Sequence, residues 1–388
     1  MIHVAEPDIN KDDILAVANV MNSNWISGTS PKVSEFEQKF AKYHNCKYGV
    51  ATGSGSTALH LALVVLGVGK GDEVIIPDFT MVACANAVSY LGAKPVFVDA
   101  NVDTWCMEDT LIEKAITKKT KAIMPVHIYG HPCNMKYLED LKEDHDIKIV
   151  EDCAEAHGAE YNGRKVGSFG DCGVFSFYAN KIITTGEGGL LITNDEALAE
   201  KAQWYKAHCF GRGGKHFWHD KIGFGYRMSG LQATLGISQL ERIDNYVEQR
   251  RSRAKMYMNM LAGLAHVGKI KFPVQKRLVK NVYWMFSILV NPEKFGMTRD
   301  KLMIKLANDG IETRTMFYPM HIQPSYKTTE KFPVADFLCK NGLNLPSGNN
   351  LTQFQVNKIC ERIRYYGKEI DDIQKKTEEM KKVKVALQ

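Results

Sequence analysis

GVFSFYANKIITTGEGGLLITND, residues 173–195, contains two apolar runs separated by a turn that carries Lys181. KIVED, residues 148–152, is another apolar run and ends in Glu151 and Asp152. Short runs rich in β-branched and aromatic residues, bounded by turn residues, are typical of buried strands. In open α/β sheets, ligands bind beyond the carboxyl ends of the strands. The sequence therefore predicts a sheet whose strand ends present two acids and a lysine to a ligand.

The alternation of apolar runs with helical patterns extends over residues 48–195. Patterns such as STALHLALVVLG (56–67) and MEDTLIEKAIT (107–117) separate the runs. Because several links are long enough for crossover helices, we expect a mostly parallel sheet covered on both faces. The predicted strands are YGVAT (48–52), VIIP (74–77), PVFVDA (95–100), AIMPVHIY (122–129), KIVED (148–152), VFSFY (174–178) and LLITN (190–194).

The second half of the chain predicts a smaller α/β domain. A helical pattern over 231–264 is too long for one ordinary helix, so we expect it to bridge two domains. YWMFSILVNP (283–292) and RDKLMIKLANDG (299–310) follow as a strand and a helix. We expect a large cofactor-binding domain at 10–245 and a small domain at 246–388.

Composition is that of an ordinary globular enzyme, with 45% hydrophobic and 24% charged residues. The 50 Lys and Arg are mixed with 44 Asp and Glu, a balance that suits phosphorylated ligands but does not indicate nucleic acid. The nine cysteines form no CxxC pair, so we predict reduced thiols, a cytoplasmic location and no metal site. No apolar window is long enough to cross a membrane, and we expect no membrane partner.

TGSGSTA, residues 52–58, reads as a turn between a strand and a helix. Gly53, Gly55 and Ala58 fit the loose dinucleotide fingerprint G-x-G-x-x-A, and Asp78 ends the next strand. A small-residue turn at a helix start also exposes backbone N–H groups to any phosphate. A phosphate site formed by Gly55, Ser56 and Thr57 follows in either case, and a nicotinamide-dependent dehydrogenase remains an alternative.

Asp152 and Lys181 favour a different cofactor. A carboxylate at a strand end can pair with a protonated pyridine nitrogen, which makes the ring an electron sink. Lys181 stands between two sheet-like runs and close to glycines, where loss of hydration lowers an amine pKa as Schiff-base chemistry requires. Ser176, on the same strand, can reach a phosphate.

The run at 151–195 resembles the DegT/DnrJ/EryC1/StrS sugar aminotransferases, which are fold-type I pyridoxal 5'-phosphate enzymes. The resemblance covers nearly the whole chain. Its other segments are NWISGTSPKVSEFEQKFAKYH (24–44), PDFTMVACANAV (77–88), MPVHIYGHP (124–132), YRMSGLQATLGISQLERID (226–244), GIETRTMFYPMH (310–321) and LNLPSG (343–348).

The resemblance assigns a role to each matching position. Lys181 would hold pyridoxal 5'-phosphate as a Schiff base and shuttle the proton, and Asp152 would pair with the pyridine nitrogen. Glu155 would lie near the ring hydroxyl. Gly55, Ser56 and Ser176 would bind the phosphate, and Met81 would cover the ring face. The substrate side would be formed by His157, Asn180, Arg314 and His321. His157 and Asn180 could equally be structural support, and Arg314 and His321 could equally belong to a solvated strand end.

VHIYGHP (126–132), FWHDKIG (217–223) and YRMS (226–229) resemble most the branch that aminates C4 of GDP-4-keto-6-deoxymannose, with glutamate as donor. Sugars linked to dTDP or UDP, and amination at C3, remain open. So does a non-catalytic sensor of the same fold. Family dehydratases place His where Lys181 stands, which disfavours that activity. The resemblance also implies a homodimer with active sites shared between subunits.

Three positions depart from the family pattern. Met81 stands where an aromatic residue usually stacks on the ring, and a thioether covers a ring face with less specific geometry. Gly225 replaces an Asn that reaches the phosphate of the neighbouring subunit, so we expect water or backbone to replace that donor, or weaker cofactor binding. Gly230 stands where relatives often have Asn.

Overall fold

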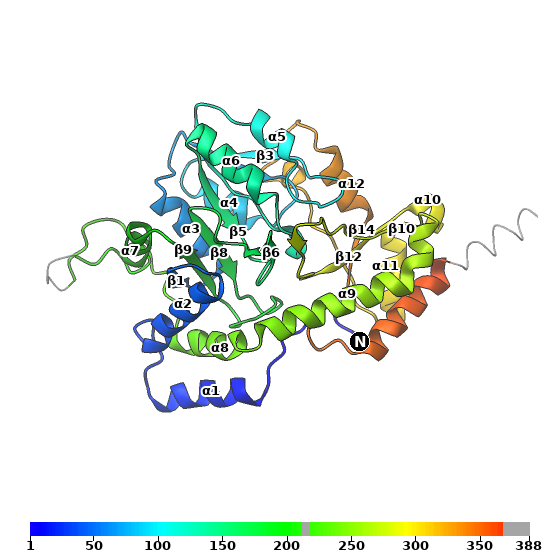
Figure 1. The fold of residues 1–388 in the computed structure, drawn as a ribbon, viewed down its shortest axis with the longest axis horizontal. Coiled ribbons are helices and arrows are strands. Elements are labelled where there is room, and N and C mark those ends of the chain that lie inside the picture. Colours follow the sequence, from blue (N-terminus) through cyan, green and yellow to red (C-terminus); the bar gives the residue numbers. More distant parts are fainter. Residues whose placement is uncertain (212–216, 368–388) are drawn as a thin grey trace, which may run out of the picture.

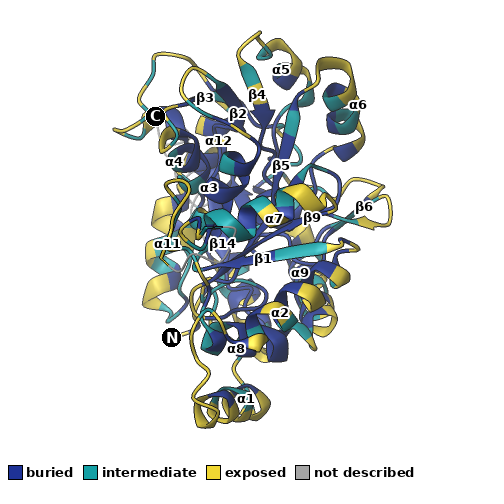
Figure 2. Cartoon of the chain, turned by 90° about the vertical axis from the view of Figure 1, so that its left-hand side faces the viewer, coloured by how far each residue is buried: buried dark blue, intermediate teal, exposed yellow. Residues whose placement is uncertain are grey.

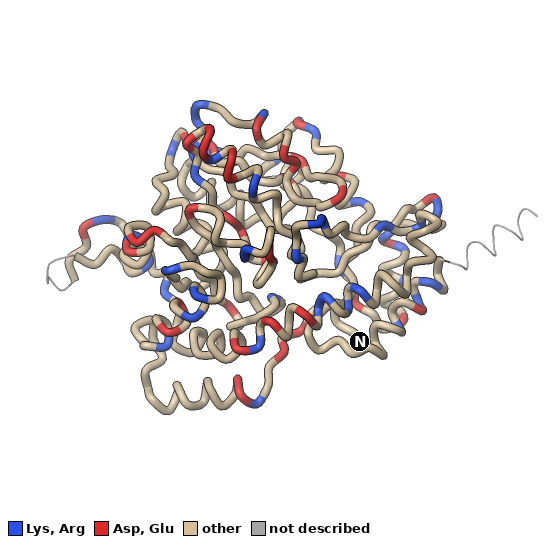
Figure 3. Tube along the Cα trace, viewed as in Figure 1, with Lys and Arg blue, Asp and Glu red and all other residues tan. Residues whose placement is uncertain are grey.

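The computed structural model of the chain describes residues 1–211 and 217–367. Its two main parts lie side by side and are linked by one long helix (Figure 1). Lys and Arg are interspersed with Asp and Glu over the whole trace (Figure 3). Within the described residues, no helix has the length and apolar character needed to cross a membrane.

A seven-stranded sheet forms the centre of the larger part, in the order β1-β9-β8-β5-β4-β2-β3. β9 runs antiparallel to both of its neighbours, and the other pairs are parallel. All seven strands predicted from the sequence are confirmed. Their bounds are β1 Tyr48–Thr52, β2 Glu73–Pro77, β3 Lys94–Val98, β4 Thr120–Ile123, β5 Lys148–Asp152, β8 Cys172–Ser176 and β9 Gly189–Thr193.

The prediction for 122–129 was too long, because β4 ends at Ile123. Pro125 has no N–H to give to a ladder, and Tyr129 has a φ of 50° within the short 3-10 turn Ile128–Gly130. The segment still contacts the sheet, because the N–H of Asp152 donates to the carbonyl of Pro125 at 2.8 Å. The chain thus leaves the sheet beside the end of β5.

Helices cover both faces of this sheet, as the sequence predicted. On β2, Val74 and Ile76 join the main core while Ile75 joins a second core on the opposite face. The first core includes α3 (Gly55–Val65) and α4 (Ala83–Ser89), and the second includes α5 (Asp109–Lys114) and α6 (Met135–His145). The strands at the centre of the sheet, such as β2 and β8, are buried between them (Figure 2). The same part of the chain includes the helices α1 (Lys11–Asn22), α2 (Pro31–Tyr43) and α7 (Glu196–Tyr205). It also contains a hairpin of β6 (Glu160–Tyr161) and β7 (Arg164–Lys165), and β11 (Val279–Lys280) pairs with β6.

A second, antiparallel sheet has its own core and the order β10-β12-β14-β13. Its strands are β10 (Ile270–Lys271), β12 (Phe286–Val290), β13 (Arg314–Thr315) and β14 (Gly342–Leu345). The helical elements around it are α10 (Pro292–Phe295), α11 (Arg299–Asn308), the 3-10 turn η2 (Met320–Ile322), α12 (Pro333–Asn341) and a final helix from 353 to the last described residue.

The helical stretch at 231–264 forms two helices, α8 (Gly230–Leu240) and α9 (Ile243–His266). The first turn of α9 packs into the core of the large sheet through Ile243 and Val247, and its last turns pack into the second core through Leu261 and Leu264. α9 therefore spans both cores (Figure 1). The division into domains at 10–245 and 246–388 stays a prediction, and residues 368–388 lie outside the described residues.

Candidate active site

A cavity of about 320 Å³ opens where β5 and β8 end. It is lined by Ser54, Gly55, Ser56, Leu59, Thr80, Met81, Ala83, Val126, Asp152, Ala154, Glu155, Ser176, Tyr178, Asn180, Lys181, Glu187, Trp284 and Phe317. Eight residues predicted from the sequence are among them: Gly55, Ser56, Met81, Asp152, Glu155, Ser176, Asn180 and Lys181. The strand ends thus bring residues that are far apart in the sequence into one site.

Lys181 follows β8 in a turn, where its N–H donates to the carbonyl of Tyr178 at 2.9 Å. Its Nζ lies 3.9 Å from the centre of the Trp284 ring. Burial lowers the pKa of Lys181, although the negative charges of Glu155 and Asp152 oppose the shift. A lowered pKa increases the fraction of neutral amine, which is the nucleophilic form. Lys181 is therefore suited to condense with an aldehyde.

Asp152 ends β5 as a buried carboxylate with two fixed donors. Oδ1 accepts from the N–H of Ala154 at 2.9 Å, and Oδ2 accepts from the thiol of Cys84 at 3.1 Å. Each carboxylate oxygen can accept more than one hydrogen bond, so Asp152 still has room for a charged donor from the cavity.

Glu155, three residues after Asp152, is a second buried acid. Its Oε2 accepts from the backbone N–H of Tyr129 at 2.7 Å. Burial raises the pKa of Glu155 to about 7, against the opposing charge of Lys181. At neutral pH this carboxyl can therefore either donate or accept a proton.

The start of α3 forms a narrow cradle beside β8. A Cβ at Gly55 would lie 2.8 Å from Cβ of Ser176, and a Cβ at Gly189 would lie 2.1 Å from the carbonyl oxygen of Ser54. Glycine at both positions lets the helix start approach the sheet closely, and the helix dipole favours an anion there. The Ser176 hydroxyl completes a set of donors that fits a phosphate.

Asn180 gives a further indication that this cavity is suited to a polar ligand. Its side-chain Oδ1 is buried without a hydrogen-bond partner among the described residues. A buried polar atom without a partner is unfavourable unless a ligand or water satisfies it. Together with the amine, the carboxylates and the phosphate cradle, it makes this donor set a good fit for pyridoxal phosphate.

Two predicted residues do not face the cavity. Thr57 forms a capping box with Ser54, whose hydroxyl accepts the N–H of Thr57 at 3.2 Å, so this donor is already used within α3. His157 is fully buried between Phe40, Phe175 and Phe177. Its imidazole supports the core and cannot contact a sugar directly.

The two predicted substrate residues of the segment 310–321, Arg314 and His321, also lie outside the cavity lining. Arg314 is exposed, and its guanidinium pairs with Glu312 at 3.1 Å. His321 is buried, with Nδ1 2.7 Å from Oδ2 of Asp78 and Nε2 3.3 Å from Asp336. The carboxylate of Asp78 is therefore engaged by His321 and does not serve as a ribose acceptor in a dinucleotide fingerprint.

Trp284, Phe317 and Cys84 are among the residues at this site that the sequence did not indicate. Trp284, from the segment before β12, and Phe317, after β13, close one side of the cavity. Cys84 lies behind Asp152. Trp284 and Phe317 are far from Lys181 in the sequence, and apolar residues carry no sign of a ligand. PDFTMVACANAV contains Cys84, but no spacing rule links a single thiol to a carboxylate in another segment.

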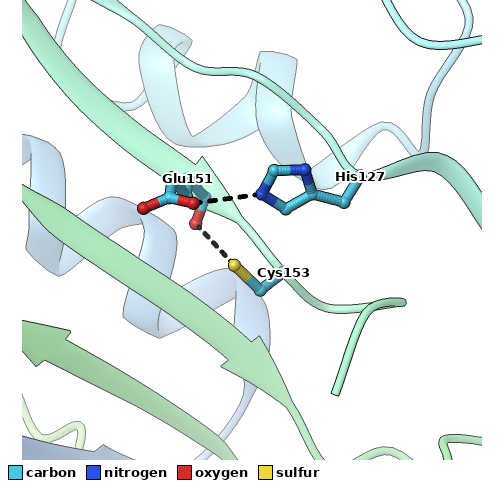
Figure 4. Close-up of side chains that lie close together, drawn as sticks. All are labelled: His127, Glu151 and Cys153. Atoms are coloured by element: carbon cyan, nitrogen blue, oxygen red, sulfur yellow. Dashed lines mark hydrogen bonds and ion pairs between the residues drawn. The ribbon is translucent and has the colours of Figure 1, made fainter. Parts of the chain in front are cut away.

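A cluster of His127, Glu151 and Cys153 lies behind the end of β5, with possible metal-binding atoms within 4.8 Å of one another (Figure 4). Glu151 accepts the N–H groups of Gly167, Phe169 and Gly170 at 2.7–2.8 Å, and His127 Nε2 lies 3.2 Å from it. These contacts occupy the carboxylate. We therefore assign the cluster the structural role of holding the loop at 167–170 against β5.

Residues 7–364 match the DegT/DnrJ/EryC1/StrS aminotransferase family. The chain belongs to this family. It is therefore a pyridoxal phosphate-dependent sugar aminotransferase, which takes an amino donor and a keto sugar. This membership excludes the nicotinamide-dependent dehydrogenase.

Individual relatives agree over almost the full length of the chain. It is 41% identical to the GDP-perosamine synthase of Escherichia coli O157:H7, with 94% of this chain and 98% of the relative covered. Among solved structures, S. venezuelae DesV in complex with a ketimine intermediate has a TM-score of 0.85 at 34% identity, over 92% of this chain and 94% of DesV. The PLP form of the putative sugar aminotransferase Spr1654 from Streptococcus pneumoniae has a TM-score of 0.86 at 29% identity, over 95% and 99%.

The three departures from the family pattern have different settings. Met81 lines the cavity and is half exposed. A Cβ at Gly225 would lie 3.0 Å from the imidazole of His208, so a side chain there would have to displace that ring. A Cβ at Gly230 would lie 2.6 Å from Cβ of Ser30. Gly230 is thus required by the contact between α8 and the start of α2.

Proposed function

We propose that this aminotransferase moves the amino group of glutamate onto C4 of a nucleotide-linked 4-keto-6-deoxy sugar, and that the sugar substrate is GDP-4-keto-6-deoxymannose. The observation that carries the reaction type is one cavity that holds a buried amine with a lowered pKa, a buried carboxylate at the end of β5 and a phosphate cradle. The choice of sugar is supported by the 41% identity to a GDP-perosamine synthase.

Each residue of the cavity has a distinct role in this proposal. Lys181 would carry the cofactor through Nζ, and Asp152 would pair with its pyridine nitrogen. Gly55, Ser56 and Ser176 bind the phosphate. Pyridoxal phosphate supplies an electron sink for the negative charge that forms at the substrate carbon. Met81 and Glu155 also line the cavity, where Met81 would contact the ring and Glu155 the ring hydroxyl.

Lys181 has a second task once a substrate amine has displaced it. Its Nζ would take up the α-proton of glutamate and pass a proton back to the cofactor side, and hydrolysis by water would then release 2-oxoglutarate. The keto sugar then takes up the amino group through the same steps in reverse. Lys181 acts as a base only while it is neutral, and burial favours that state.

The sugar assignment is tested with the aminated form of the purified enzyme, prepared with glutamate. This form is mixed with GDP-, dTDP- and UDP-linked 4-keto and 3-keto sugars, and the cofactor absorbance is followed through a single turnover. We expect GDP-4-keto-6-deoxymannose to reverse the spectral change fastest. Turnover of a dTDP or UDP sugar, with no response to the GDP sugar, would contradict the assignment.

Lys181→Ala tests the reaction type. We expect activity to fall by at least about 10³-fold, because both the covalent attachment and the proton transfer depend on one amine. The matched control is Lys136→Ala, an exposed lysine that pairs with Asp140. Borohydride should fix the cofactor to the wild type and to the control but not to Lys181→Ala. Retained activity in the variant would overturn the proposal.

We also propose a homodimer with shared active sites. α1 stands at the edge of the molecule (Figure 2). This helix and the segment after it expose apolar side chains. These are Ile14, Leu15, Met21, Trp25 and Ile26. Exposed apolar groups gathered in one place are typical of a protein interface. Light scattering of the purified protein should give twice the chain mass, and a monomer at micromolar concentration would contradict this.

A further inference from the structure

Cys84 lies behind the cavity, on the first turn of α4, and has no exposed surface. Its Sγ is 3.1 Å from Oδ2 of Asp152 and 3.6 Å from Oγ1 of Thr80. Asp152 ends β5, whereas Cys84 and Thr80 follow β2, on the other side of β4. The thiol thus links two strand ends that do not pair with each other.

The direction of these hydrogen bonds follows from the chemistry of the groups. The carboxylate of Asp152 can only accept, so the thiol donates its proton to Oδ2. The hydroxyl of Thr80 is then free to donate to the sulfur. Burial and the negative charge of Asp152 raise the pKa of Cys84 well above its usual range, so the thiol keeps its proton at working pH.

Among the described residues, two donors hold the carboxylate of Asp152. One is the N–H of Ala154, which holds Oδ1 at 2.9 Å. The other is the thiol of Cys84. Without the thiol, the N–H of Ala154 alone holds the carboxylate, and the terminal torsion is less restrained because carboxylate torsions have broad minima.

We propose that Cys84 is a positioning residue: its S–H donates to Asp152 and holds the carboxylate in the orientation that meets the pyridine nitrogen of the cofactor. Thr80 orients the thiol in turn. This inference rests on the proposed role of Asp152. Cys84 itself does not contact the reacting atoms.

The test compares Cys84→Ser, which keeps a donor, with Cys84→Val, which removes it and keeps most of the volume. Cys360→Val is the control, because Cys360 is equally buried but belongs to the second core. The dissociation constant of pyridoxal phosphate is measured by titration into each apoenzyme. The pH dependence of the bound-cofactor absorbance and the values of kcat and KM for glutamate are measured in parallel.

We expect Cys84→Val to raise the dissociation constant about 3–10-fold, as for the loss of one weak donor to a charged acceptor. Its absorbance–pH curve should shift, and kcat should fall more than KM changes. Cys84→Ser should stay within about twofold of the wild type. Cys360→Val should bind the cofactor like the wild type.

Two results would overturn the inference. One is a Cys84→Val enzyme with wild-type cofactor affinity and an unchanged absorbance–pH curve. The other is a folded Cys84→Ser enzyme as impaired as Cys84→Val, which would mean that sulfur packing rather than the donor matters. If the wild-type apoenzyme itself failed to bind pyridoxal phosphate, the proposed function would fall together with this inference.

Discussion

Glu155 lies in the cavity as a carboxyl whose pKa is about 7, because burial penalises its charged form. In the unfolded chain the same group titrates near pH 4.5. Its contribution to folding is therefore fully present at low pH and is lost as the pH rises from about 4.5 to about 7. A shift of this size corresponds to about 3 kcal/mol.

Glu155→Gln removes the titration but keeps an oxygen that can accept from Tyr129. We predict that the variant gains stability relative to the wild type between pH 5 and pH 8, by up to about 3 kcal/mol. The measurement is urea unfolding of both apoenzymes at the two pH values. A stability difference that is the same at pH 5 and pH 8 would show that Glu155 does not titrate in this window.

Trp284 offers its ring face to the amine of Lys181 at 3.9 Å. Such a contact stabilises the ammonium form by about 0.5–2 kcal/mol. In Trp284→Leu the ammonium loses this contact, so the pKa of Lys181 should fall further. The pH dependence of the rate at which apoenzyme takes up pyridoxal phosphate reports this shift. Trp284→Phe, which keeps a ring, should lie closer to the wild type, and equal pH profiles for all three enzymes would refute the contact.

Residues at strand ends were the ones that sequence alone could place. Lys181, Asp152 and Ser176 were predicted at the edge of a parallel sheet, and the fold brings them into one cavity. His157 and His321 were chosen by residue type and by resemblance. In the structure, the imidazole of His157 packs in the aromatic core and that of His321 packs against Asp78. The sequence could not predict this, because it does not show which way a side chain points.

At the scale of elements, the cradle depends on the contact between β9 and the start of α3. Gly189 pairs with both Thr52 and Ser176, and a Cβ there would lie 2.1 Å from the carbonyl oxygen of Ser54. Gly189→Ala must therefore push the start of α3 away from β9. We predict at least about tenfold weaker pyridoxal phosphate binding and a lower melting temperature, because backbone atoms cannot move as cheaply as side chains.

Gly69→Ala is the control for this substitution. Gly69 has open space where a Cβ would lie and no positive φ. Cofactor titration and thermal unfolding of this variant should match the wild type. If Gly189→Ala behaves like Gly69→Ala, the close approach of α3 to β9 is not what shapes the phosphate site.

The order of elements was predictable because each strand of the large sheet is a short apolar run between turn residues. The length of β4 was not, since Pro125 follows the strand inside a continuous apolar segment. The family departure at Gly230 also needed the structure. Its cause is a contact with Ser30, which is distant in the sequence. Local patterns thus define elements, while their close approaches depend on tertiary packing.

At the scale of the whole molecule, α9 carries a connection between the second sheet and the active site. Arg250 is fully buried on this helix, and burial and the charge of Arg253 lower its pKa to about 9. Its Nη1 donates to the carbonyl of Trp284 at 2.6 Å, and its Nε donates to Oδ1 of Asn349 at 2.7 Å. The side-chain amide of Asn349 donates in turn to the carbonyl of Ile182, the residue after Lys181.

Arg250→Met tests whether this network keeps Lys181 and Trp284 in their positions relative to each other. Methionine fills much of the volume but leaves the carbonyl of Trp284 and Oδ1 of Asn349 without this donor. We predict a loss of about 2–3 kcal/mol in the free energy of unfolding and several-fold weaker pyridoxal phosphate binding. The control is Lys255→Met, an exposed position on the same helix, which should change neither quantity. The network joins α9 to the turn that carries Lys181, so a loss of stability should be accompanied by weaker cofactor binding. If the variant unfolds more easily but binds the cofactor with wild-type affinity, Arg250 contributes to stability and not to the active site.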